Sequence, residues 1–131
     1  YDWYMVFANN VNLFRFMFPI EDGSKPQFNV LEQDVEDLRS DPVWLQNYKE
    51  GIMWVANSWG WDAFEAKKLQ SPQRGMKWDE WDVRLAKMIR SLWLFKEHEL
   101  MISMQKFARE IAPNGGLKYG HLCLDEVFYM T

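Results

Sequence analysis

The sequence predicts an all-α fold, a compact bundle of five or six helices with an aromatic-rich core. Apolar residues recur three or four positions apart in several segments, which is the period of an amphipathic helix. Alternating runs typical of strands are few, and valine and isoleucine are scarce. Eight Trp, five Tyr and nine Phe supply 17% of the 131 residues. Since each such ring buries about 150–250 Å², a small chain can fill a core with them.

The length predicts a single helical domain over residues 1–131. Apolar residues make up 48% and charged residues 26% of the chain, which is typical of a globular protein and excludes a disordered one. The sequence begins at Tyr1 rather than Met. We therefore expect a fragment that lacks its N-terminal start.

The first predicted helix covers residues 2–18. Trp3, Phe7, Phe14 and Phe18 lie at helical multiples, and Pro19 ends the segment. A loop over residues 21–26 follows, because Gly, Ser and Pro cluster there.

The second predicted helix covers residues 29–38. Asn29 is the expected N-cap, with Glu32 as its capping-box partner three residues on. Leu31, Val35 and Leu38 form one face of this helix. The other face is acidic and carries Glu32, Asp34, Glu36 and Asp37.

The clearest helix covers residues 41–60. Asp41 is an N-cap, Pro42 suits the first turn, and Gly60 suits the left-handed position after the last turn. Its apolar stripe predicts a central core element and consists of Trp44, Tyr48, Ile52, Val55 and Trp59. Residues 61–76 are predicted to form a loop, in which residues 63–69 suit a short helical turn.

Two further stripes predict the C-terminal half of the bundle. One begins after the N-cap Asp79 and contains Trp81, Leu85, Met88, Ile89, Leu92 and Phe95. The other contains Leu100, Met104, Phe107 and Ile111 and ends before Pro113. Without a break near Lys96, the two would form one helix of about nine turns. Residues 122–130 are predicted to form a short closing helix.

Charge and cysteine content exclude several classes of protein. The formal net charge of −4 and the absence of a basic stripe exclude nucleic acid as a partner. No apolar run approaches the roughly 20 residues that span a bilayer, so we expect no membrane insertion. The single cysteine, Cys123, excludes an internal disulfide and favours a reducing, intracellular compartment.

Residue sets that support catalysis or metal binding are missing. His98-Glu99 begins like the zinc-protease helix motif, but Ile102 stands where the second histidine is required. His121 and Cys123 are two residues apart and would not face each other on a helix. We therefore predict no enzymatic activity, no metal and no cofactor.

The candidate interaction residues are basic or aromatic. Arg84, Lys87 and Arg90 gather on one side of their predicted helix. We favour their pairing with the acidic helix at residues 32–37, and a docking patch for an acidic partner is the alternative. Trp61 and Trp78 are candidate exposed anchors for a larger assembly.

The order of several motifs resembles the opioid growth factor receptor conserved region. Residues 13–20, Leu-Phe-Arg-Phe-Met-Phe-Pro-Ile, are similar to the end of that family's first helix. Residues 83–92, Val-Arg-Leu-Ala-Lys-Met-Ile-Arg-Ser-Leu, resemble its Arg-containing signature, and residues 124–129 resemble its closing segment. Histidines that precede two of the family's motifs are replaced here by Val11 and Glu80.

This resemblance implies an all-helical, non-catalytic domain linked to opioid-peptide (enkephalin) receptor activity. It also implies a cytoplasmic, perinuclear or nuclear location. Our first hypothesis is therefore a binding module for a protein or peptide partner. One alternative is a small-molecule-binding or enzymatic domain with an aromatic-lined pocket. The other is a structural subunit of a larger assembly. The sequence leaves the ligand and the oligomeric state open.

Overall fold

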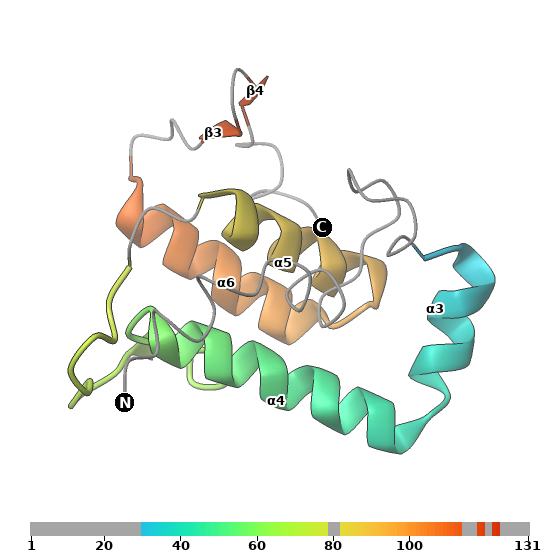
Figure 1. The fold of residues 1–131 in the computed structure, drawn as a ribbon. Helices are drawn as coiled ribbons and strands as arrows, with labels where there is room; N and C mark the ends of the chain where they lie inside the picture. Colours follow the sequence, from blue (N-terminus) through green and yellow to red (C-terminus); the bar gives the residue numbers. More distant parts are fainter. Residues whose placement is uncertain (1–29, 79–81, 114–117, 120–121, 124–131) are drawn as a thin grey trace.

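The computed structural model describes residues 30–78, 82–113, 118–119 and 122–123 (Figure 1). This part of the chain is mostly helical, which confirms the helical class. Its four helices are α3 (Glu32–Arg39), α4 (Pro42–Ser58), α5 (Asp82–Leu94) and α6 (His98–Ile111). Its two small antiparallel sheets pair β1 (Trp61–Asp62) with β2 (Lys67–Lys68) and β3 (Lys118–Tyr119) with β4 (Leu122–Cys123). The predicted helix 2–18, Asp79 and Trp81 lie outside the described residues, so the count of five or six helices stays a prediction.

Helix α4 forms as its local sequence predicts. The Asp41 carboxylate accepts the backbone N–H groups of Val43 and Trp44 at 3.0 and 3.2 Å. Gly60 has a φ of +83°, and a Cβ there would lie 3.4 Å from the Met76 carbonyl oxygen. The predicted stripe faces the core, because Tyr48, Ile52, Val55 and Trp59 are buried and Trp44 is half-buried.

Helix α3 begins later than predicted. Its N-cap is Leu31 instead of Asn29, and the Asp34 carboxylate accepts the Leu31 N–H at 2.9 Å in place of Glu32. The predicted apolar face is only partly correct. Val35 is buried and Leu38 half-buried, but Leu31 is 74% exposed. Its four carboxylates are exposed as predicted.

Helices α5 and α6 are separated by a sharp turn, which we call the elbow (Phe95, Lys96 and Glu97). The Glu97 N–H donates to the Leu92 carbonyl at 2.9 Å, and the Lys96 N–H donates to the Trp93 carbonyl at 3.1 Å. These bonds and the Lys96 φ of +61° form a Schellman C-cap. The break therefore exists, and the short connection turns α6 back along α5 (Figure 1).

Residues 61–68 form a β-hairpin, so the predicted helical turn is wrong, whereas the predicted loop is confirmed over residues 69–76. Trp61 pairs with Lys68, and Asp62 pairs with Lys67. The Asp62 carboxylate accepts the Glu65 N–H at 3.0 Å and stabilises the turn. The closing helix predicted over 122–130 is also wrong at its start, because Leu122–Cys123 is strand β4. Residues 124–130 lie outside the described part.

Aromatic rings fill the core in two clusters. The first joins Trp44 and Tyr48 of α4 to Phe95, with ring centroids 4.9–5.2 Å apart. The second cluster has centroid distances of 5.2–6.1 Å and contains Trp59, Trp61, Trp78 and Phe107. These rings pack against one another and belong to the core of the described residues.

Tyr48 connects α4 to α5 through a buried hydrogen bond, 2.8 Å from its hydroxyl oxygen to Ser91 Oγ. Burial raises the pKa of Tyr48 well above its ordinary value of 10.0. Below pH 10 both the folded and the unfolded chain keep this proton. Above pH 10 the unfolded chain loses it and the folded chain keeps it, so stability falls as pH rises.

We therefore expect the free energy of unfolding to fall by about 1.4 kcal/mol per pH unit above pH 10 on account of Tyr48. Tyr48→Phe removes this contribution, so the difference in stability between the two proteins should shrink between pH 10 and 12. Urea denaturation across that range measures the effect. A constant difference would contradict a neutral, buried Tyr48.

Candidate functional site

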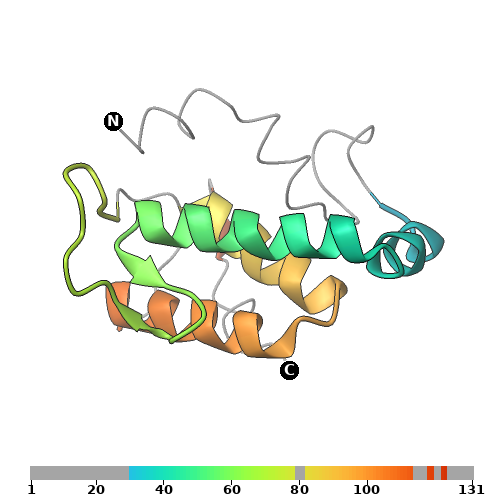
Figure 2. The ribbon, with the colours of Figure 1, turned by 90° about the horizontal axis from the view of Figure 1, so that it is seen from below.

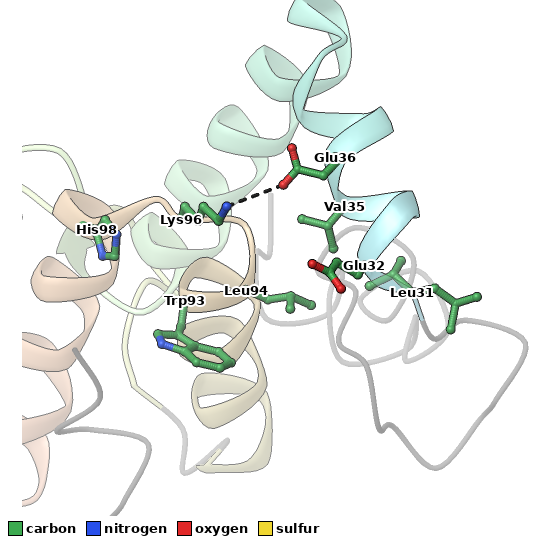
Figure 3. A pocket seen from close by; sticks show the side chains of 9 residues that line it. Leu31, Glu32, Val35, Glu36, Trp93, Leu94, Lys96 and His98 are labelled. Carbon is green, nitrogen blue, oxygen red and sulfur yellow. Dashed lines mark hydrogen bonds and ion pairs between the residues drawn. The ribbon is translucent and has the colours of Figure 1, made fainter.

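The described residues line an open groove of about 590 Å³ between α3 and the C-terminal end of α5 (Figure 3). Its apolar walls come from Val30, Leu31 and Val35 on the α3 side, and from Trp93 and Leu94 on the α5 side. Its polar groups are Glu32, Glu36, Lys96 and His98. Sites for small ligands typically have volumes of about 300–1,000 Å³, so the groove is large enough for one or two side chains of a partner.

The charge of the groove is unbalanced. Lys96 Nζ lies 3.5 Å from Glu36 Oε1, and both side chains are exposed. The Glu32 side chain has no ion pair or hydrogen bond with any described residue. It points from α3 toward the groove (Figure 3). Its two carboxylates and one lysine leave the groove with one excess negative charge, which favours a cation.

Two ion pairs connect α3 to the elbow. In one of them the elbow supplies the cation, and in the other α3 supplies it. Lys96 of the elbow pairs with Glu36 of α3, and Arg39 at the end of α3 pairs with Glu97 of the elbow at 3.5 Å. Lys49 of α4 also lies 3.6 Å from the Glu97 carboxylate, which is only 15% exposed. Glu97 therefore connects α3, through Arg39, and α4, through Lys49, next to the groove.

Comparison with known proteins gives no match. No family model matches the chain, and neither a curated protein nor a solved structure does. The resemblance to the opioid growth factor receptor conserved region therefore rests on the sequence motifs alone.

The predicted basic residues do not line this groove. Arg84, Lys87 and Arg90 all lie on α5, and each takes part in a non-covalent interaction. Arg84 stands about 15 Å along the helix axis from Leu94, at a rise of 1.5 Å per residue. Lys96 of the elbow pairs with the acidic helix through Glu36. Pairing of Arg84, Lys87 and Arg90 with that helix stays a prediction.

The two candidate anchors are not exposed as expected. Trp61 is fully buried, with an exposed fraction of 0%, so its role as a surface anchor is wrong. Trp78 is half-buried and packs edge-on against Trp59 and Phe107 at 5.2 and 5.6 Å. Both tryptophans instead complete the second aromatic cluster.

Neither a metal site nor a membrane span is found in the described residues. No group of three or more His, Cys, Asp or Glu side chains lies close enough there to hold a metal ion. None of the described helices is both long and apolar enough to cross a bilayer. His121 and the side chain of Cys123 lie outside the described part of the chain.

Sequence analysis missed the groove, although one signal was present. Trp93 lies between the core positions Leu92 and Phe95 but off the α5 stripe. A large aromatic residue off the apolar face of a helix indicates an exposed ring, and Trp93 is 36% exposed.

Charge-reversal variants can show whether Lys96 or Arg84 pairs with the acidic helix α3. We expect Lys96→Glu and Glu36→Lys each to lower stability slightly and the double variant to recover about 0.2–1 kcal/mol, because the pair is exposed. If Arg84 pairs with α3 as well, Arg84→Glu combined with Glu36→Lys should also recover part of the stability that each single change loses, and strict additivity would exclude that pairing. Urea midpoints of the single and double variants measure both couplings. A coupling with Arg84 equal to that with Lys96 would favour the pairing expected from the sequence.

Proposed function

We propose that this protein is a non-catalytic helical binding module that holds a cationic, partly apolar peptide segment in the groove between α3 and α5. One observation carries the proposal: Glu32 lies without an ion-pair partner among the described residues, at the edge of a groove with apolar walls. Such a groove suits a ligand with an ammonium group next to an apolar side chain.

The groove provides both kinds of contact that this ligand requires. An apolar or aromatic side chain can pack against Trp93 and Leu94, which supply its α5 wall. An ammonium group within hydrogen-bond distance of Glu32 would compensate the excess negative charge. The Lys96–Glu36 pair at the rim is neutral as a unit, so one positive charge on the ligand balances Glu32 and is the best match.

The motif resemblance supports a peptide as the ligand. The opioid growth factor receptor family is linked to opioid peptides, and we propose an enkephalin-type peptide as the first ligand to test, bound in an intracellular setting. The alternative hypothesis, a small-molecule-binding or enzymatic domain with an aromatic-lined pocket, stays a prediction.

Calorimetric titration with an enkephalin tests the proposal. We expect Glu32→Gln to weaken binding about tenfold or more, because a hydrogen bond to a charged group contributes about 1.5–3 kcal/mol. An N-acetylated peptide, which lacks the ammonium group, should bind the unmodified protein equally weakly.

Asp37→Asn is the matched control. It removes one negative charge from the same exposed helix but does not line the groove. We expect little change in affinity from this variant. Equal losses for Glu32→Gln and Asp37→Asn would show only a general charge effect, and the absence of any heat of binding would refute the peptide proposal.

A further inference from the structure

Helix α3 stands at the N-terminal end of α4, beside the three-helix body that α4, α5 and α6 form (Figure 2). Of its eight residues only Val35 is buried, whereas six of 17 are buried in α4, six of 13 in α5 and seven of 14 in α6. Leu38 is half-buried, and the four carboxylates of α3 are exposed. An element with few buried apolar contacts has a low local stability, so we expect α3 to be the least stable of the four described helices.

The connection between α3 and α4 is short and exposed. It consists of Ser40 and Asp41, and neither side chain is buried. Asp41 is fixed to α4, because its carboxylate accepts the backbone N–H groups of Val43 and Trp44. Rotation about the Ser40 backbone can therefore change the direction of α3 while the N-cap of α4 stays in place.

Glu97 of the elbow offers α3 an ion-pair partner that is fixed to the three-helix body. Its carboxylate lies 3.6 Å from Lys49 Nζ of α4, so it stays with the body whether or not α3 is docked. Arg39 at the end of α3 reaches the same carboxylate at 3.5 Å. Arg39 Nη1 is buried there but forms no hydrogen bond with a described residue. Because a buried donor without a hydrogen bond costs free energy, this ion pair holds α3 only weakly.

The second ion pair between α3 and the elbow adds little. Lys96 and Glu36 are 63% and 56% exposed, and exposed ion pairs contribute little to stability. The two walls of the groove belong to different parts of this arrangement. Leu31 and Glu32 lie on the α3 side, and Trp93 lies on the α5 side. Any movement of α3 away from the body therefore separates the two walls.

We propose that α3 is a hinged arm, which detaches from the three-helix body and docks again through the Arg39–Glu97 ion pair, and so opens and closes the groove. The docked position is the one in which residues of both walls line the groove (Figure 3). A ligand that contacts both walls binds this position and shifts the equilibrium toward it. The effect of a ligand rests on the proposed function, whereas the movement itself needs no ligand.

Amide hydrogen exchange of the full chain, followed by mass spectrometry of peptic fragments, tests the movement. An isolated helix shorter than about 12–15 residues is marginal in water, so the eight-residue α3 loses its helical hydrogen bonds whenever it detaches. We expect the amides of α3 to exchange at least about tenfold faster than those in the middle of α4. Equal protection of α3 and α4 would overturn the inference.

Substitutions at the ion pair should release α3 alone. We expect Glu97→Gln to accelerate exchange in α3 about tenfold and in α5 and α6 by less than about twofold, because the ion pair joins α3 to a body that stays folded. Arg39→Gln should have the same effect, and the double variant should exchange no faster than the faster single variant. Additive effects, or equal acceleration in all four helices, would contradict a hinge that this pair closes.

Glu99→Gln is the matched control. It removes the same charge from the first turn of α6, two residues after Glu97, where Glu99 forms no ion pair with a described residue. We expect this variant to leave exchange in α3 unchanged. Acceleration equal to that of Glu97→Gln would show only a general charge effect and overturn the role of the Arg39–Glu97 pair.

The same measurement with enkephalin separates the inference from the proposed function. If both are correct, saturating enkephalin should slow exchange in α3, and the N-acetylated peptide at the same concentration should slow it less. Fast exchange in α3 that depends on Glu97 but not on enkephalin would support the inference and refute the peptide proposal. Enkephalin binding to a chain in which α3 is as protected as α4 would refute the inference and support the peptide proposal.

Discussion

Trp61→Ala is expected to lower the free energy of unfolding by about 3–5 kcal/mol, the usual cost of removing a buried Trp or Phe side chain. Trp61 is fully buried and its ring centroid lies 5.2 Å from that of Phe107. Its indole N–H also donates to Ser103 Oγ, so the variant loses a buried hydrogen bond as well as packing. Urea denaturation followed by far-UV circular dichroism measures the change.

Two further variants, Trp61→Phe and Phe64→Ala, test whether the loss of stability comes from the burial of Trp61. Trp61→Phe keeps much of the ring volume but leaves the buried Ser103 hydroxyl without this donor, so we expect a loss of about 1–3 kcal/mol. Phe64→Ala removes an aromatic ring from the same hairpin at an exposed position and should change stability by less than about 0.5 kcal/mol. Similar losses for Trp61→Ala and Phe64→Ala would contradict the burial of Trp61.

The hairpin that buries Trp61 was not predictable from periodicity. Each strand has two residues, and a two-residue strand cannot show an alternating pattern. Gly60 and Asp62 beside Trp61 are typical loop residues, which suggested an exposed ring. Asp62 does indicate a turn, since its carboxylate accepts the Glu65 N–H. The direction of Trp61, however, depends on α6, which lies some 40 positions later in the sequence.

Helices α4, α5 and α6 were largely predictable because their signals are local. Asp41 caps α4 with its own side chain, and the described residues of the three apolar stripes are buried or half-buried. The elbow was harder to place, because its left-handed residue is Lys96 and neither Gly nor Asn marks the position. Sequence therefore predicted the helices and left open the turn that brings Lys96 to α3.

The groove depends on contacts between segments far apart in the sequence. Its walls come from residues 30–36 and from residues 93–98, and the Lys96–Glu36 pair connects positions 60 apart. The acidic face of α3 was visible in the sequence, but its cationic partner could not be identified, because complementary charges on several helices fit equally well.

Ile52→Ala should lower the free energy of unfolding by about 2–5 kcal/mol, the range for large-to-small changes in a core. Ile52 lies in the middle of α4 with an exposed fraction of 0%, one turn after Tyr48. Because α4 contributes to both aromatic clusters through Trp44, Tyr48 and Trp59, a cavity at this position would loosen the packing between them. The change is measured as a shift of the urea midpoint at constant slope.

Two milder substitutions should lower the free energy of unfolding less than Ile52→Ala does. Ile52→Val removes a single methyl group and should cost about 0.5–1.5 kcal/mol. Val43→Ala shortens a side chain on the same helix that is largely exposed, so it should change stability by less than about 0.5 kcal/mol. If α4 is a central core element, the loss in free energy of unfolding should be largest for Ile52→Ala, smaller for Ile52→Val and smallest for Val43→Ala. A midpoint for Ile52→Ala equal to that of Val43→Ala would show that α4 does not pack into the core in solution.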